Sequence, residues 1–253
     1  MGRTIAVANQ KGGVGKSTTA INLSACLAEQ GKKVLTIDMD PQGNTTSGLG
    51  VDKNEVEDTL YELLVGQSDV EKTIVKDVVE NVDLIPSNVN LSGAEIELVS
   101  IDNKEYILKE ITDKIKNNYD YIIIDCPPSL GLLSLNALTA SDTLIVPLQC
   151  EYYALEGLSQ LLGTVRTVKQ HYNEHLELEG VLYTMYDTRL KLNSQVVDEV
   201  NQYFPNKAYK TTIPRSVKLA EAPSFGKPIF YYEKYSKPAF AYKKFADEFL
   251  KKQ

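Results

Sequence analysis

Short apolar runs alternate with amphipathic segments along almost the whole of this 253-residue chain. Runs rich in Val, Ile and Leu predict strands at residues 5–8, 33–37, 82–86, 119–125, 143–147 and 180–185. Apolar residues at helical spacing predict helices at residues 18–30, 58–65, 104–117, 155–170, 194–203 and 239–250. We therefore expect an α/β fold, in which a single domain over residues 1–253 holds a mostly parallel, twisted sheet with helices on both faces.

The predicted strand at residues 119–125 carries apolar residues on both of its faces, as a central parallel strand requires. It ends in Asp125, and the strand at residues 33–37 leads directly into Asp38 and Asp40. Ligands of open α/β sheets bind at the carboxyl ends of the strands, so we expect these carboxylates beside a ligand. Residues 88–101 mix apolar and acidic residues and predict a helix and a connection near this edge, without indicating a function.

A glycine-rich segment, QKGGVGKSTT, follows the first predicted strand and opens a helix. Its glycines let the backbone fold closely around an anion, and its N–H groups point at phosphate oxygens. Lys16 supplies positive charge to the β- and γ-phosphates, and the Ser17 hydroxyl is placed to bind Mg²⁺. A strand that ends in an aspartate, as at Asp125, holds this ion or its waters in such sites. The sequence therefore predicts a cradle for a nucleoside triphosphate with magnesium.

Position 10 departs from the usual phosphate-binding pattern, because it holds Gln10 where that pattern has glycine, and Lys11 follows. The resulting Lys-Gly-Gly-x-x-Lys-Ser resembles the deviant Walker A box of the ParA/MinD family of ATPases. Further stretches match Soj-like chromosomal and small plasmid ParA proteins, namely residues 38–44, 121–131, 151–157, 213–215 and 221–224. The resemblance covers nearly the whole chain and leaves no room for the N-terminal helix-turn-helix domain of larger plasmid relatives.

The resemblance implies ATP and Mg²⁺ as cofactors and a role for each residue of the site. Asp40 would orient the attacking water, with a structural turn aspartate as the alternative; Asp38 would support it. The expected catalytic residues are Lys11, Lys16 and Asp40, and the expected metal-binding residues are Ser17, Asp40 and Asp125. The expected nucleotide-binding residues are Lys11, Gly12, Gly13, Val14, Gly15, Lys16, Ser17 and Thr18 around the phosphates, with Met185, Pro214, Arg215 and Ser216 around the adenine.

Lys11 has a distinct role in the family that the chain resembles. There the signature lysine reaches across a dimer interface to the ATP of the partner subunit and neutralises charge as an arginine finger does. Two buried triphosphates that face each other repel unless such lysines compensate. We therefore expect an ATP-dependent homodimer.

Charge is distributed unevenly along the chain, although the net charge is −7. Residues from Asn201 onward carry +7 and the first 200 carry −14, which predicts a polyanion-binding face, with a solvated lysine-rich surface as the alternative. The resemblance places DNA-binding basic residues at Arg189 and Lys218. The full set of candidates for contacts to nonspecific double-stranded DNA is Arg189, Arg215, Lys218, Lys227, Lys234, Lys243 and Lys244. Joining two such faces in a dimer would make DNA binding depend on ATP.

The implied function is DNA segregation, of a chromosome or a plasmid, with slow ATP hydrolysis stimulated by a ParB-type centromere-binding partner. The chain has no run of about 18 apolar residues and no signal peptide, so we expect a cytoplasmic protein, associated with the nucleoid when ATP is bound. Its three cysteines form no C-x-x-C pair, which argues against a disulfide framework, a zinc knuckle or an iron–sulfur ligand set and predicts buried apolar roles.

Two alternatives remain open. A MinD-like membrane switch would use the closing helix, where Phe245, Phe249 and Leu250 lie opposite lysines, but we favour core packing, because any terminal helix packed on a sheet shows such a stripe. An ATP-dependent ligase or synthetase would need a second substrate pocket, and no pair of nucleophile and base is evident. The two histidines, His171 and His175, are expected at a helix end in solvent.

Overall fold

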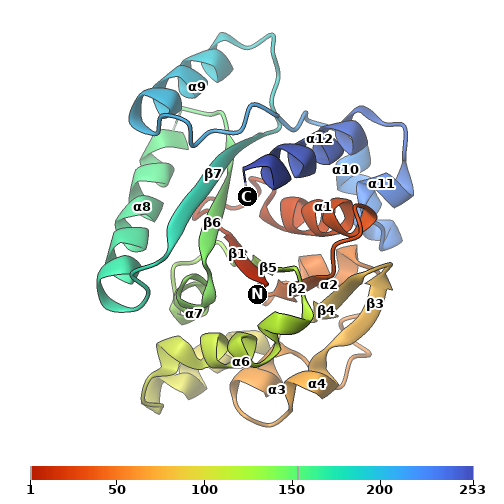
Figure 1. The fold of residues 1–253 in the computed structure, drawn as a ribbon, viewed down its shortest axis with the longest axis vertical. Coiled ribbons are helices and arrows are strands. Elements are labelled where there is room, and N and C mark those ends of the chain that lie inside the picture. The colour runs from red at the N-terminus through yellow and green to blue at the C-terminus, as the bar shows by residue number, and fades with distance from the viewer. Residues whose placement is uncertain (1, 153, 253) are drawn as a thin grey trace.

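A seven-stranded sheet runs through the centre of the computed structural model, which describes residues 2–152 and 154–252 (Figure 1). The strand order is β3-β4-β2-β5-β1-β6-β7. The strands are β1 (Arg3–Val7), β2 (Val34–Asp38), β3 (Val75–Val79), β4 (Val82–Ile85), β5 (Tyr121–Asp125), β6 (Thr143–Gln149) and β7 (Glu177–Thr184). Neighbouring strands are parallel except for β3, which is antiparallel to β4. The prediction of a mostly parallel α/β sheet is confirmed.

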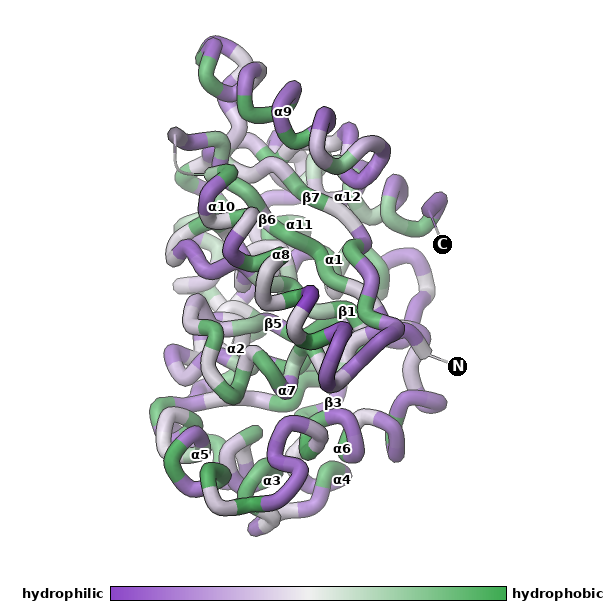
Figure 2. The backbone as a smooth tube through the Cα atoms, turned by 90° about the vertical axis from the view of Figure 1, so that its left-hand side faces the viewer, coloured by the Kyte–Doolittle hydropathy of each residue, from purple (hydrophilic) through white to green (hydrophobic). Residues whose placement is uncertain are grey.

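Alternate residues of the central strands face two separate layers of core. Ile123 of β5 packs with helix α1 (Lys16–Glu29) and helix α12 (Lys237–Lys251), whereas Ile122 and Ile124 pack with the helices of the opposite face. All three isoleucines have no exposed surface, as expected of a strand covered on both sides. Figure 2 shows the strands at the centre as hydrophobic and the hairpin around β3 as mainly hydrophilic.

The helices of the opposite face are α6 (Ile107–Ile115), α7 (Leu132–Ala140) and α8 (Ala154–His171) (Figure 1). The other helices are α2 (Asn44–Gly48), α3 (Leu60–Leu64), α4 (Val70–Thr73), α5 (Leu91–Glu97), α9 (Lys191–Tyr203), α10 (Val217–Glu221) and α11 (Ile229–Tyr232). The 3-10 turns are η1 (Leu98–Ser100), η2 (Lys104–Tyr106), η3 (Lys116–Asn118) and η4 (Ala222–Phe225).

The apolar stripe of the closing helix α12 is buried in the core. Phe245 and Phe249 have no exposed surface, and their rings meet Tyr209 and Tyr121 edge-on at centroid distances of 4.7 and 5.5 Å. The aromatic side chains therefore anchor α12 on α1 and the sheet, as the core-packing interpretation predicts. None of the helices in the described ranges is long and apolar enough to cross a membrane. The three cysteines are free and buried, as predicted.

Some elements differ from the sequence prediction. The expected helix over residues 104–117 is divided into η2, α6 and η3, and the short helices α2, α4, α7, α10 and α11 were not predicted. Strand β3 was not predicted either, because its Val-Lys-Asp-Val-Val sequence does not alternate and its middle residue Asp77 has a left-handed φ of +50°. Tyr153, which belongs to one of the stretches matched above, lies outside the described residues.

Candidate nucleotide-binding site

The glycine-rich loop lies between β1 and α1 at the carboxyl edge of the sheet. Its backbone is left-handed at Gly13 and Gly15, where φ is +72° and +89°, a conformation that strongly favours glycine. The loop is held against the sheet at Val14, which is buried and whose carbonyl oxygen accepts a hydrogen bond of 2.7 Å from the Thr184 hydroxyl at the end of β7. A Cβ added at Gly12 or Gly13 would meet nothing within 4 Å, so the loop borders open space just before α1.

A cavity of about 460 Å³ opens at this loop. Its lining brings together the predicted residues Gly12, Gly13, Gly15, Lys16, Ser17, Thr18 and Asp40. Met185, which was expected near the adenine, also lines it, as do residues that the sequence analysis did not assign to the site: Ile21, Gln42, Asn44, Ser47, Pro128, Leu219, Ala220 and Pro223. Lys16 is only 7% exposed, and its ammonium group makes no hydrogen bond or ion pair with another of the described residues, although its charge lowers the pKa of the nearby Asp125. A buried ammonium group that is not ion-paired is costly, so this cavity suits an anion.

Two buried aspartates lie side by side behind the loop. Asp38 and Asp125 are register partners at the ends of β2 and β5, and neither is exposed. Burial, together with repulsion by Asp38, raises the pKa of Asp125 to about 7. Burial also raises the pKa of Asp38 to about 6, although hydrogen bonds from Thr46 act to lower it. Both the backbone N–H and the hydroxyl of Thr46 donate to Asp38 Oδ2 at 2.7 Å. Burial thus makes the charged forms of these two carboxylates costly, and a cation beside them would offset that cost.

The donor set around Asp125 fits a magnesium ion. Asp125 Oδ2 accepts a hydrogen bond of 2.7 Å from the Thr45 hydroxyl, and the Ser17 hydroxyl also bonds this carboxylate. Its other oxygen, Oδ1, is buried and has no hydrogen-bond partner among residues 2–152 and 154–252. Within the described residues no cluster of three His, Cys, Asp or Glu side chains could hold a metal by itself. One carboxylate and one hydroxyl suit Mg²⁺, which takes its remaining ligands from phosphates and water.

Asp40 lies at the rim of the same cavity and is 7% exposed. Its Oδ1 accepts a hydrogen bond of 2.9 Å from the Gln42 N–H, and its carbonyl oxygen accepts one of 2.9 Å from the Ser87 hydroxyl. The carboxylate therefore stabilises the turn at residues 40–43 and at the same time faces the phosphate cavity. Ser87, which follows β4, carried no signal by itself, and Gln42 was noted only as part of the matched stretch 38–44.

A second, largely apolar pocket of about 260 Å³ adjoins the loop. The predicted adenine neighbours Met185, Pro214, Arg215 and Ser216 line it together with Gly15 and Thr18. The remaining lining residues, which were not predicted, are Thr184, Ile213, Leu219, Ala220 and Tyr242. Met185 has a left-handed φ of +49°, a strained conformation of the kind that is often found at binding sites. A flat apolar ring would fit this pocket beside the phosphate cavity.

Comparison with known proteins agrees with this geometry. Residues 2–178 match the family described as AAA domain. The sporulation initiation inhibitor protein Soj of Bacillus subtilis is 58% identical to the chain over 248 residues, which are 98% of each protein. The chain belongs to the Soj/ParA family of partition ATPases.

Solved structures in the same fold hold nucleotides. A Mycobacterium smegmatis structure described as cobyrinic acid a,c-diamide synthase with bound ATP analog and magnesium is 40% identical, with a TM-score of 0.87 over 99% of this chain and 95% of that one. A putative plasmid partition protein of Borrelia burgdorferi bound to AMPPNP is 29% identical, with a TM-score of 0.86 over 100% of both chains. The P-loop NTPase fold of this ParA-family chain is thus shared with nucleotide-binding proteins.

Lys11, the signature lysine of this ParA-family chain, does not line the phosphate cavity. Its ammonium group is ion-paired with the Glu151 carboxylate, and its backbone N–H donates to Asn9 Oδ1 at 3.0 Å. The structure therefore separates the two lysines of the Walker box. Lys16 lies inside the cavity, and Lys11 lies beside it.

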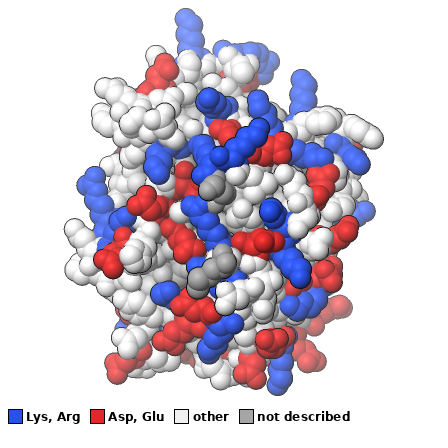
Figure 3. Space-filling view, viewed as in Figure 1, with Lys and Arg blue, Asp and Glu red and all other residues white. Residues whose placement is uncertain are grey.

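The candidate DNA-binding residues are all at least partly exposed, and several have acidic partners. Lys and Arg side chains are frequent in the upper part of Figure 3, where α12 and its neighbours lie. Ion pairs join Arg189 to Asp187 at 2.6 Å, Lys218 to Glu233 at 2.7 Å and Lys243 to Glu29 at 2.7 Å. Lys234 and Lys243 both lie over the Phe230 ring, Arg215 approaches the Met185 sulfur at 3.8 Å, and Lys227 and Lys244 are exposed.

His175 is exposed near the end of α8, as expected.

Proposed function

We propose that this ParA-family chain is an ATP-dependent DNA-segregation ATPase in which ATP joins two protomers and the dimer binds DNA nonspecifically. Slow hydrolysis, stimulated by a ParB-type partner, returns the protein to monomers. The observation that carries the proposal is the different placement of the two lysines, with Lys16 buried in the phosphate cavity and Lys11 outside it. Such a protein works in the cytoplasm, as one ATPase domain, and joins the nucleoid in its ATP-bound form.

Within one protomer, the loop N–H groups and Lys16 bind the β- and γ-phosphates, and Thr18 contacts the α-phosphate. Ser17 and Asp125 would hold Mg²⁺, which neutralises charge on the phosphates when it is bound. Asp40 faces the phosphate cavity and orients the attacking water. The adenine lies in the apolar pocket between Met185 and residues 214–216.

Between protomers, Lys11 reaches the partner's triphosphate, so assembly requires nucleotide on both sides. Each protomer then contributes one basic face, and two weak faces joined in one dimer bind DNA far more tightly than either alone. Because phosphate contacts dominate such binding, affinity falls steeply with salt and depends little on sequence.

ATPase activity measured with plasmid DNA alone, with a candidate ParB-type protein alone and with both tests this proposal. We expect weak activity in the first two cases and strong joint stimulation in the third. A synthetase built on the same fold would instead require a small-molecule acceptor and would ignore DNA. Turnover that DNA and the ParB-type protein leave unchanged contradicts the proposal.

A further inference from the structure

The ion pair between Lys11 and Glu151 joins the signature lysine to its own protomer. The two side chains are 38% and 45% exposed, so solvent screens the attraction but does not abolish it. Glu151 lies two residues beyond the end of β6, where its N–H donates to the Gln149 carbonyl oxygen at 2.9 Å. The pairing therefore connects the entrance of the glycine loop to the end of a neighbouring strand.

A buried asparagine strengthens the same connection. Asn9 is 3% exposed; its Nδ2 donates to the Pro147 carbonyl oxygen of β6 at 2.7 Å, and its Oδ1 accepts from the Lys11 N–H at 3.0 Å. Both the backbone and the side chain of Lys11 are thus held at β6. Beyond Lys11 the loop lies in the open, because Gly12 and Gly13 are exposed and a Cβ on either would meet nothing within 4 Å.

We propose that Glu151 is a positioning residue that retains Lys11 in its own protomer and so sets the ATP concentration at which dimers form. This inference rests on the proposed action of Lys11 across the dimer. A single, half-exposed carboxylate is a weaker partner for an ammonium group than a triphosphate is. Lys11 therefore leaves Glu151 when a nucleotide-loaded second copy of this chain approaches, and each protomer gives up one ion pair as the dimer forms.

The expected size of the effect follows from the exposure of the pair. Exposed ion pairs contribute about two- to fivefold to an equilibrium constant. Two pairs break in each dimer, so removing both should tighten the dimer by about four- to 25-fold. The effect should shrink at high salt, because salt already screens the pair.

Glu151→Gln tests the inference, since it removes the charge and keeps the size of the side chain. Dimer dissociation constants would be measured by sedimentation velocity with Mg²⁺ and AMPPNP at low and high salt. Glu156→Gln is the matched control, because Glu156 is exposed on the adjacent helix and makes no contact with Lys11. We expect Glu151→Gln to dimerise more tightly, Glu156→Gln to match the wild type, and both to bind nucleotide as monomers with unchanged affinity.

The outcomes separate the inference from the proposed function. A Glu151→Gln dimer as weak as the wild type or weaker overturns the positioning role, and damage to the fold cannot imitate the tightening that we expect. Lys11→Ala is measured beside it. If Lys11→Ala loses the dimer while Glu151→Gln leaves it unchanged, only the role of Glu151 is wrong. If Lys11→Ala dimerises like the wild type, the proposed action of Lys11 is wrong and the role of Glu151 falls with it.

Discussion

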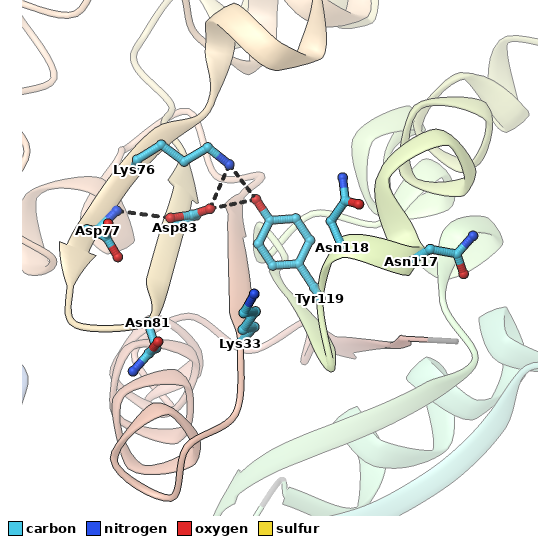
Figure 4. Close-up of a pocket in the computed structure, with 8 residues that line it drawn as sticks. All are labelled: Lys33, Lys76, Asp77, Asn81, Asp83, Asn117, Asn118 and Tyr119. Atoms are coloured by element: carbon cyan, nitrogen blue, oxygen red, sulfur yellow. Dashed lines mark hydrogen bonds and ion pairs between the residues drawn. The ribbon is translucent and has the colours of Figure 1, made fainter.

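Two polar hollows lie at opposite edges of the same sheet. They differ in whether their charged side chains form ion pairs and hydrogen bonds with one another. The nucleotide cavity occupies the carboxyl edge, beyond Asp38 and Asp125. The other hollow, of about 700 Å³, lies at the amino edge around Lys33, Lys76 and Tyr119 (Figure 4). It is the larger of the two, so volume alone would select the wrong site.

The amino-edge hollow has paired charges. Asp83 accepts hydrogen bonds from the Tyr119 hydroxyl at 2.6 Å, the Lys76 ammonium at 2.8 Å and the Asp77 N–H at 2.9 Å (Figure 4). Although burial opposes the change, the hydrogen bonds from Lys76 and Tyr119 lower the pKa of Asp83. In the nucleotide cavity, by contrast, the buried Lys16 ammonium group forms no ion pair with any described residue, and burial raises the pKa values of Asp38 and Asp125. Charged side chains that lack ion-pair partners, more than the volume of the cavity, distinguish the functional site.

The largest contrast is expected between Lys16 in the nucleotide cavity and Lys76 in the amino-edge hollow. Lys16→Ala should lower the rate of ATP hydrolysis by about 10²–10³-fold, because it removes the charge that stabilises the transferring phosphoryl group. Lys76→Ala, at the amino edge, should leave the rate within about twofold of the wild type. Steady-state phosphate release measures both; equal losses would show that the comparison of the two hollows is mistaken.

A smaller loss is expected for Asp40→Asn, which keeps an acceptor for the Gln42 N–H but removes the negative charge. Hydrolysis should fall by about 10²-fold, the usual contribution of a group that positions or polarises water. Nucleotide affinity, measured by titration with a fluorescent ATP analogue, should stay near that of the wild type. Normal turnover in Asp40→Asn would leave Asp40 with a structural role in the turn, and Asp77→Asn provides the control at the other edge.

The two edges should also respond to pH in opposite directions. The pKa values of Asp38 and Asp125 are raised in the folded protein, so the stability that this pair contributes is present at low pH and is lost as pH rises through 6 to 7. Without nucleotide and Mg²⁺, Asp38→Asn should therefore reduce the loss of stability between pH 5 and pH 8 by on the order of 2 kcal/mol. The pKa of Asp83 is lowered, so its contribution is present at neutral pH and is lost on acidification.

Urea denaturation at several pH values measures these changes. Asp83→Asn should destabilise the protein at pH 7 and have less effect as pH falls through the lowered pKa. If Asp38→Asn and Asp83→Asn changed the pH profile in the same direction, the contrast between the edges would be refuted.

The smallest effect is expected at the partly exposed Lys76. Lys76→Met should lower the free energy of unfolding by at most about 1 kcal/mol, because partly exposed ion pairs contribute little. The ATP-dependent properties of the protein should not change. A loss of activity in Lys76→Met with normal stability would assign the amino-edge hollow a functional role.

Local patterns explain which parts of the molecule the sequence predicted. The glycine loop and Asp125 lie directly after strands whose apolar runs are unmistakable, so their joint position at one edge follows from chain order. Met185 and residues 214–216 were expected near the adenine only through the family resemblance. Tyr242, which also lines that pocket, gave no signal, because its place depends on how α12 packs against α1.

Contacts between residues that are far apart in the sequence could not be predicted from the sequence. Glu151 meets Lys11 across 140 residues, and the Asp83 group gathers residues from β3, β4 and the start of β5. Neither arrangement has a local periodicity or motif from which it could be inferred. Strand β3 was missed because its valines do not alternate with polar residues and Asp77 interrupts it with a left-handed φ.

Sedimentation velocity of the wild type and of Lys11→Ala, each with Mg²⁺ and AMPPNP, tests the central claim most directly. We expect the wild type to form a dimer with nucleotide and to be a monomer without it. We expect Lys11→Ala to bind the nucleotide and to remain a monomer. A Lys11→Ala protein that dimerises as readily as the wild type would contradict the claim that this lysine makes ATP the switch for assembly.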